Sequence, residues 1–281
     1  MGCSSRVRIV AYENSSDASV GAGRLFSAPV LVTGLLETTD LVQDPSLSPD
    51  ELEIYFAALK NGTYDIWMST RLTTSSPWAS AVVVSELSTN SADFEPDLSS
   101  AGLTIYFSSD RPGGDPNYRI WVAQRQKRTD PWGVPQVVNL GPTSTDRGPA
   151  VDVSGLLMVY ASDHGMGNFD IYRTTRDTTT AAWGAPVNIS EINSSVFDWD
   201  PAVYREGLGL VFGSRRNGDQ KSSDLFESVR ASSSAQFSAP QSLDELNSKA
   251  AEGDPWLSDD GRHIVFSSER SGVPRLYEAW R

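Results

Sequence analysis

Short apolar runs recur along this chain at intervals of just over fifty residues. They are rich in β-branched and aromatic residues and bounded by turn residues, a pattern typical of β-strands. The five runs are Ile54-Tyr55-Phe56, Ile105-Tyr106-Phe107, Met158-Val159-Tyr160, Leu210-Val211-Phe212 and Ile264-Val265-Phe266. A proline precedes each run, and these prolines (Pro45, Pro96, Pro149, Pro201 and Pro255) lie 51, 53, 52 and 54 positions apart. The chain is therefore interpreted as five copies of one structural unit.

A polar turn and a second apolar segment follow each run. The second segments are Asp65-Ile66-Trp67, Arg119-Ile120-Trp121, Asp170-Ile171-Tyr172, Asp224-Leu225-Phe226 and Arg275-Leu276-Tyr277. In the second copy the turn between the two strands has the sequence Ser109-Asp110-Arg111, and the first copy lacks this motif. No helical periodicity of useful length appears, so we expect few helices.

A further element with an aromatic start completes four of the repeats. It begins at Trp78, Trp132, Trp183 and Phe237, and these aromatic residues are expected to pack between repeats. The fifth copy stands near the N-terminus, where Phe26-Ser27-Ala28-Pro29 repeats the residues at 237–240. The chain ends directly after the third strand of the last repeat. This order predicts an all-β fold, a five-bladed β-propeller of four-stranded antiparallel blades, whose last blade is completed by Phe26 to about Leu36.

The length and composition agree with one closed domain. The chain has 281 residues, of which 39% are hydrophobic, enough for a core. We expect residues 1–23 to form a flexible tether and residues 24–281 to form a single monomeric propeller. The net charge of −13 argues against binding to nucleic acid and favours cations or basic partners. No apolar run approaches the roughly 20 residues of a membrane helix.

The single cysteine, Cys3, excludes an intrachain disulfide and a cysteine-based zinc site. The start Met1-Gly2-Cys3 resembles the lipid attachment site of a bacterial lipoprotein whose signal has been removed. Myristoylation at Gly2 is the rival interpretation, but that motif requires Ser or Thr where Arg6 stands. The third alternative is an exposed tail with an accidental cysteine. We predict lipidation at Cys3, with membrane contact only through that anchor.

Three phrases in the repeats resemble a known family. Ser48-Pro49-Asp50, the run 105–114 and Ser258-Asp259-Asp260-Gly261 are similar to the WD40-like "PD40" repeat of TolB-type propellers. The resemblance covers about residues 26–281, but repeats three and four depart from the expected Ser-Pro-Asp-Gly wording at 152–155 and 204–207. It implies a binding or scaffold module in the bacterial periplasm or at the outer membrane surface.

Acidic residues recur where one repeat leads into the next. Asp44, Glu95, Asp200 and Asp254 stand directly before the repeat prolines, and Asp93, Asp146, Asp198 and Glu252 stand three residues before them. In a propeller these loops gather at one mouth of the central channel. Carboxylates crowded there raise one another's pKa or recruit a cation, and oxygen ligands favour Ca²⁺ or Mg²⁺. We predict a metal site of Asp44, Glu95, Asp200 and Asp254. The alternative is a set of pairs within the blades, each acid bound to the arginine of its own turn.

The third repeat differs from the others. Gly148 replaces the acid, Arg147 stands beside it, and His164 replaces the turn arginine. Phe94 and Trp199 flank the acids at positions suited to stacking on a ligand. We predict ligand contacts from Arg147, His164, Trp199, Phe94 and Arg111. Sequence drift in one repeat is the alternative for the third blade, and His263, which precedes a core strand, is expected to be structural.

Two functions remain open at this point. The first is a binding module of the cell envelope that presents its acidic channel face to a protein, peptide or glycan, with or without a central divalent cation. The second is a carbohydrate hydrolase or lyase that uses paired carboxylates at the channel mouth. The sequence contains no serine-hydrolase elbow, metalloprotease histidine pair, phosphate-binding loop or dinucleotide fingerprint, and no catalytic residue is assigned.

Overall fold

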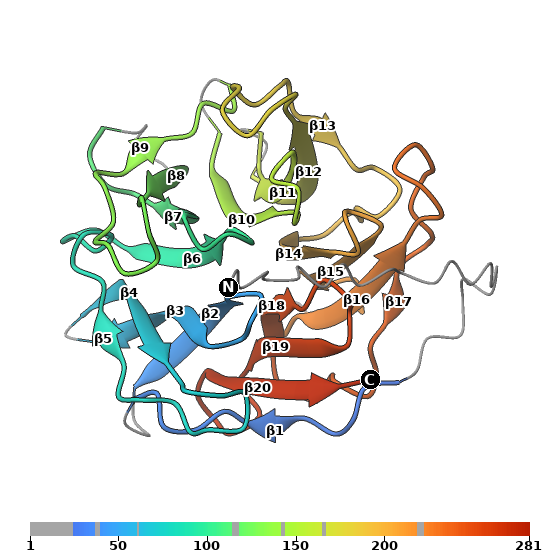
Figure 1. The fold of residues 1–281 in the computed structure, drawn as a ribbon. Coiled ribbons are helices and arrows are strands. Elements are labelled where there is room, and N and C mark those ends of the chain that lie inside the picture. The colour runs from blue at the N-terminus through green and yellow to red at the C-terminus, as the bar shows by residue number, and fades with distance from the viewer. Residues whose placement is uncertain are drawn as a thin grey trace, which may run out of the picture.

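A computed structural model describes residues 25–36, 40–60, 62–113, 118–141, 144–164, 167–217 and 222–281. These residues form twenty strands in five separate four-stranded sheets. Figure 1 shows the sheets arranged around a central axis like the blades of a propeller. The predicted five-bladed propeller is confirmed. The described residues contain no helix, and hence none that could cross a bilayer.

Every blade is an antiparallel sheet whose strands follow one another from the axis outwards. Blade 1 comprises β2 (Leu41–Leu47), β3 (Glu53–Lys60), β4 (Thr63–Thr70) and β5 (Val82–Val83). Blade 2 comprises β6 (Asp93–Leu98), β7 (Thr104–Ser109), β8 (Arg119–Gln124) and β9 (Gln136–Val137). Blade 3 comprises β10 (Asp146–Val151), β11 (Leu157–Ser162), β12 (Asp170–Thr175) and β13 (Val187–Asn188). Blade 4 comprises β14 (Asp198–Tyr204), β15 (Gly209–Ser214), β16 (Asp224–Val229) and β17 (Gln241–Ser242).

Blade 5 joins the two ends of the described chain. It comprises β18 (Glu252–Leu257), β19 (His263–Ser268), β20 (Arg275–Trp280) and β1 (Val30–Leu31), in the sheet order β1-β20-β19-β18. Val30 pairs with Glu278 and Leu31 pairs with Tyr277. The predicted closure by the N-terminal segment is confirmed, although the strand within Phe26–Leu36 is only two residues long (Figure 1).

The core lies between the blades. One apolar cluster combines Tyr55 and Ile66 of blade 1 with Ile105 and Phe107 of blade 2, and four further clusters fill the remaining junctions. Because each blade buries both faces, the second strands are apolar throughout rather than alternating. Burial of these side chains is the main source of stability.

An arginine stacks on the aromatic residue that starts each outer segment. The five pairs are Arg71 on Trp78, Arg125 on Trp132, Arg176 on Trp183, Arg230 on Phe237 and Arg281 on Phe26, with the guanidinium carbon 4.1–4.6 Å from the ring centre. Trp132 and Trp183 also meet Tyr55 and Tyr106 of the preceding blade edge to face. The expectation that these aromatic residues pack between repeats is confirmed.

Candidate functional site

Each innermost strand carries a β-bulge directly before its proline. The pairing register shifts at this point in β2, β6, β10, β14 and β18. The bulged residues are Asp44, Glu95, Gly148, Asp200 and Asp254, with φ of 56°, 53°, 60°, 48° and 49°. A side chain in this left-handed region costs about 1 kcal/mol or more, a cost that glycine avoids. Four of the five blades accept this strain, and in each of them the bulged residue is acidic.

The four acidic side chains line a narrow cavity on the axis. This cavity of about 40 Å³ is bounded by Asp44, Glu95, Asp200, Asp254, Gly148 and the five repeat prolines. The structure therefore brings the four predicted metal ligands together. Since one water takes about 30 Å³ of liquid, the space suits a water molecule or an ion and is too small for a sugar ring.

Asp44 and Asp200 are the strongly perturbed members of this group. Burial, followed by the charges of Asp254 and Glu95, holds the pKa of both carboxyls well above the ordinary value. Asp44 Oδ2 accepts a hydrogen bond from the Glu95 nitrogen at 3.1 Å, but Oδ1 of Asp44 and Oδ1 of Asp200 have no hydrogen-bond partner among the described residues. Crowded carboxylates of this kind share protons or hold a cation.

Glu95 is satisfied differently from the other three acids. Its Oε1 accepts a hydrogen bond from Arg147 Nε at 2.8 Å, and its Oε2 accepts one from the Gly148 nitrogen at 2.7 Å. The Arg147 guanidinium also lies 5.2 Å from the centre of the Phe94 ring. Phe94 is buried and meets Tyr118 edge to face. Two predicted ligand contacts, Arg147 and Phe94, thus form one cluster with the acid of blade 2.

The donor set was compared with the needs of a divalent cation. Among the described residues, no group of three or more His, Cys, Asp or Glu is arranged to hold a metal ion. The two unpartnered Oδ1 atoms are hard oxygen donors of the kind that Ca²⁺ and Mg²⁺ prefer. Both Glu95 oxygens are already engaged, by Arg147 and by the Gly148 nitrogen. The predicted Ca²⁺ or Mg²⁺ site stays a prediction.

The acids three residues before the prolines belong to the blades. Asp93 pairs with Arg111, Asp198 with Arg216 and Glu252 with Arg270, at 2.5, 2.6 and 3.2 Å. Each arginine also donates to a backbone carbonyl of the preceding loop. For these outer acids the structure has the within-blade pairs that were the alternative to a site. Arg111, a predicted ligand contact, is buried in one of them.

Blade 3 lacks the turn arginine, and other residues contact its third-strand aromatic residue and its acid. The centre of the His164 ring lies 4.3 Å from that of Tyr172, where blades 2, 4 and 5 stack their turn arginine on the third-strand aromatic residue. Its acid, Asp146, is reached from blade 2 by Arg119, whose Nη2 lies 3.8 Å from Oδ2. His164 and Arg119 therefore share the role of the missing arginine.

Trp199 lies at the mouth formed by the loops between repeats. The Arg215 guanidinium stands 4.8 Å from its ring centre, and Phe197 meets the ring edge to face at 5.5 Å. Together with Gln43, Asp200 and Asp254 it lines a cavity of about 100 Å³. Of the predicted ligand contacts, Trp199 is the one that borders a cavity beside the acids.

A much wider cavity opens on the other side of the proline ring. It measures about 470 Å³ and follows the innermost strands from the prolines to the turns that lead into the second strands. Its polar and aromatic lining includes Glu51, Asp97, Trp256, Asp259, Asp260, Arg262, His263 and Trp280. Sequence reasoning placed the site at the opposite mouth and missed these residues. The available signal was position: Asp97 and Trp256 directly follow repeat prolines, on strands that line the axis.

Asp97 is an unusual carboxyl in this wide cavity. Burial raises its pKa to about 7, although its Oδ2 accepts a hydrogen bond from the Val151 nitrogen at 3.0 Å. Ser46 holds the same position in blade 1, and its hydroxyl accepts from the Leu98 nitrogen at 2.9 Å. This side chain therefore links neighbouring blades, and in blade 2 the link is ionisable.

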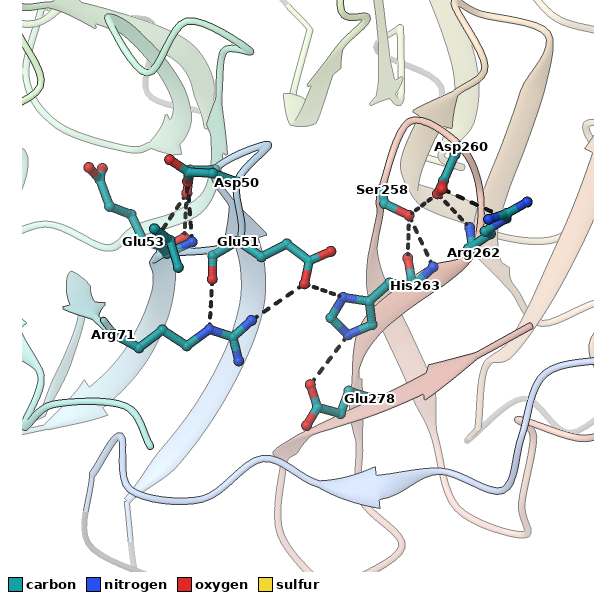
Figure 2. Close-up of polar contacts among 11 residues, drawn as sticks. Asp50, Glu51, Glu53, Arg71, Ser258, Asp260, Arg262, His263 and Glu278 are labelled. Carbon is teal, nitrogen blue, oxygen red and sulfur yellow. Dashed lines mark hydrogen bonds and ion pairs between the residues drawn. The ribbon is translucent and has the colours of Figure 1, made fainter. Parts of the chain in front are cut away.

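His263 forms part of the wall of the wide cavity, between Glu51 and Glu278 (Figure 2). It is buried and lies parallel to the Trp280 ring.

Cys3, the predicted lipidation site, and the predicted tether at 1–23 lie outside the described residues.

Comparison with known proteins identifies the fold. No protein-family profile and no curated protein sequence matches the chain. TolB from Acinetobacter baumannii aligns with a TM-score of 0.51 and 18% identity over 87% of this chain, which spans only 55% of that protein. The GH62 α-L-arabinofuranosidase catalytic domain of Coprinopsis cinerea gives a TM-score of 0.63 and 12% identity, covering 91% of this chain and 96% of the domain. The endo-arabinase of Bacteroides thetaiotaomicron gives 0.60 and 17%, covering 91% and 97%. At these identities the likeness concerns the propeller fold alone, and it extends both to TolB and to glycoside hydrolases.

Proposed function

We propose that the chain is a binding propeller that takes a basic peptide segment of a partner protein into the wide axial cavity. The observation that carries this proposal is the size and lining of that cavity. About 470 Å³ lies within the range typical of ligand sites, whereas the acidic cavity beyond the prolines holds about 40 Å³.

The charges around the wide cavity favour a cationic ligand. Glu51, Asp259 and Asp260 line it, against Arg262 and the histidine, and Asp97 adds a negative charge above its pKa of about 7. Arg262 lies 3.8 Å from Asp260 and is largely exposed, so it offsets little of this charge. The chain as a whole carries −13, which would attract a basic partner over a longer range.

Aromatic and apolar side chains complete the lining. Trp256 and Trp280 stand at the wall, and Leu98, Val151 and Leu257 cover the floor between the acids. Aromatic faces beside carboxylates suit lysine and arginine, which bind through both cation–π contacts and ion pairs. The apolar floor suits the hydrophobic residues of the same segment.

The space around the carboxylates and the hydrogen bonds that they accept favour a peptide ligand over the hydrolase alternative. Hydrolysis of a glycoside needs two carboxyl groups facing one sugar ring. The bulge acids lie in a space too small for a sugar, Asp97 accepts from Val151, and Asp260 accepts from Ser258 and the Arg262 nitrogen. The similarity to arabinan-cleaving propellers makes arabinan the appropriate substrate for excluding this alternative.

Binding of two synthetic peptides tests the proposal. The peptides have equal length, and one alternates lysine with leucine while the other alternates glutamate with leucine. Calorimetry should detect the first and not the second, with affinity falling as salt rises. Asp260→Lys should weaken binding about tenfold or more, equivalent to about 1.4 kcal/mol. Asp244→Lys makes the same charge change at an exposed residue outside the cavity and should leave binding unchanged.

Two results would overturn the proposal. Loss of binding in Trp199→Ala but not in Asp260→Lys would move the site to the narrow mouth. Release of reducing sugar from arabinan, abolished by Asp97→Asn, would make the protein a hydrolase.

We further propose a location in the bacterial envelope. The resemblance of the repeats to those of TolB-type propellers supports it. The predicted lipidation at Cys3 is tested with a lipoprotein signal placed ahead of Gly2: radiolabelled palmitate should then enter the protein in a bacterial host, and Cys3→Ser should abolish the label. An unlabelled protein with a free Cys3 thiol would contradict the anchor.

A further inference from the structure

His263 lies at the junction where the last blade meets the first. Its Nδ1 is 3.2 Å from Glu51 Oε2 and its Nε2 is 3.3 Å from Glu278 Oε2. Figure 2 shows the imidazole between these two carboxylates, with Glu51 on the turn of blade 1 and Glu278 on β20. The ring also stacks on Trp280, at 4.7 Å and an interplanar angle of 7°. A single side chain thus connects a turn of blade 1 to two strands of blade 5.

Glu51 is held in place to receive this contact. It adopts a φ of 55°, in the left-handed region of the turn between β2 and β3. Arg71 Nε donates to the Glu51 carbonyl at 2.7 Å, and Arg71 Nη2 lies 3.4 Å from Glu51 Oε2 (Figure 2). The carboxylate is therefore also held by an arginine of its own blade.

At two other blade junctions the cation of the ion pair is an arginine. At the start of β3, the position that His263 holds in β19, Glu53 binds Arg125 and Arg128 of blade 2 at 3.1 and 2.9 Å. Between blades 4 and 5, Arg281 lies 2.8 Å from Glu227. Arginine is protonated at all ordinary pH values, whereas histidine changes charge between about pH 5 and 8. The junction between blades 5 and 1 differs in having a proton-dependent ion pair.

The charges that face the imidazole favour its protonated form. Glu51 and Glu278 are in direct contact, Arg71 acts only through Glu51, and Asp260 and Arg262 lie in the turn before β19. Trp256 and Trp280 are uncharged. Burial lowers the pKa of His263, but the hydrogen bond to Glu278 and the nearby Glu51 carboxylate outweigh it, and the net shift is upward. In the neutral ring one nitrogen lone pair faces a carboxylate, so one of the two contacts becomes repulsive.

We propose that His263 is a proton-controlled latch, which holds blade 1 against blade 5 when protonated and releases Glu51 when it loses its proton. The released Glu51 belongs to the wall of the wide cavity, so the latch also changes that wall. The proposal does not depend on the identity of the ligand. Since the folded-state pKa is raised, the latch stabilises the fold fully below the unfolded value of about 6.5 and loses its effect as pH rises through the folded value.

Proton NMR of the intact chain measures the latch directly. The sequence contains two histidines, so His164→Gln assigns the signals. The His263 ring should titrate with a midpoint above about 6.5, the ordinary value. Glu51→Gln and Glu278→Gln should each lower that midpoint, because each removes one of the two facing charges. A midpoint at or below the ordinary value, or one unchanged in both glutamine variants, would overturn the proposal.

Thermal unfolding across pH supplies the second measurement. Relative to His263→Gln, the unmodified protein should lose stability as pH rises from about 6 to 9, while the matched variant His164→Gln should follow the unmodified protein. Hydrogen exchange should show faster opening of the turn at 48–53 at high pH in the unmodified protein only. If His263→Gln does not fold, the two glutamate variants serve the same comparison. A pH dependence identical in all variants would show that His263 is only a packing residue.

Discussion

The Asp44 carboxylate accepts a hydrogen bond from the backbone nitrogen of Glu95, the residue at the same position in the next blade. Glu95 does the same for Gly148 of blade 3, at 2.7 Å. Gly148 has no side chain with which to continue the series. The bulges of blades 1 and 2 thus each offer a carboxylate to the next blade, and the series stops at blade 3. The acids beyond that interruption, Asp200 and Asp254, line the narrow cavity together with Asp44, and the charge of Asp254 acts on both of the others.

Replacing one of these acids tests whether their charges oppose one another. Asp200→Asn keeps the shape of the side chain and removes its charge from a buried site next to Asp254. At pH 8 in the presence of a chelator, the variant should be more stable by about 1–3 kcal/mol, the typical cost of an uncompensated buried polar group. Because the pKa of Asp200 is raised, the unmodified protein should gain relative stability as the pH falls. Urea unfolding at several pH values measures both effects.

The exposed residue Asp244 provides the control for that substitution. Asp244→Asn changes the net charge equally and should alter stability by less than about 0.5 kcal/mol at either pH. A loss of stability in Asp200→Asn at pH 8 without metal would contradict the expectation, since it would mean that the ionised carboxylate is stabilising.

A cation in the narrow cavity makes a separate prediction. If Ca²⁺ neutralises Asp44, Asp200 and Asp254, adding it to chelator-treated protein should raise Tm, because a ligand of the folded state stabilises by mass action. Asp200→Asn should remove that increase, and Asp244→Asn should retain it. Calorimetry with Ca²⁺ that gives no heat, together with an unchanged Tm, would reject the site.

Asp97 should titrate near neutral pH. Its pKa of about 7 lies above the ordinary 3.8, so the folded protein binds the proton more tightly than the unfolded chain. Stability should therefore decrease between about pH 4 and 7 and level off above the folded value. Asp97→Asn can still accept from the Val151 nitrogen and should flatten this part of the profile. If the difference between the two proteins stays constant from about pH 5 to 8, the carboxyl is already ionised in the folded state.

Arginines that form ion pairs should contribute to stability according to how deeply the pair is buried. Arg111→Ala leaves Asp93 charged and buried, a change that typically costs about 3–5 kcal/mol. Arg128 forms its pairs with Asp50 and Glu53 from a side chain that is 35% exposed, so Arg128→Ala should cost about 1 kcal/mol or less. Chemical denaturation of the two variants checks the difference. Equal losses would contradict a structural role for the Asp93–Arg111 pair.

The fold could be predicted from the sequence because every blade is built from the same pattern of residues. The prolines, the apolar second strands and the displaced Phe26 segment each recur, and a feature that recurs at a fixed spacing indicates a structural unit. This recurrence also indicated the pairs between outer acids and turn arginines. The sequence also predicted which acids meet at the axis, since Asp44 and Asp200 occupy the same position in their repeats.

The wide cavity and its contacts could not be derived in this way. The repeat pattern predicts which end of a strand a residue occupies. The volume of the cavity at each end of the channel, however, depends on side chains from all five blades. His263 meets Glu51 only because the ring closes, so no local pattern connects them. Arg119 reaches Asp146 from the neighbouring blade, a pair that no pattern within blade 3 predicts.

Closure of the ring by the N-terminal segment leads to the last prediction. Phe26 is 4% exposed and packs with residues of blades 4 and 5, and Arg281 stacks on it at 4.4 Å. The adjacent Leu25 is 76% exposed. Phe26→Ala should therefore cost about 3–5 kcal/mol, whereas Leu25→Ala should change stability by less than about 0.5 kcal/mol. Hydrogen exchange should locate the effect, with faster exchange along β20, whose outer edge pairs with β1. If both variants unfold at the same denaturant concentration as the unmodified protein, the segment adds nothing to ring stability, and closure by β1 would be geometric rather than energetic.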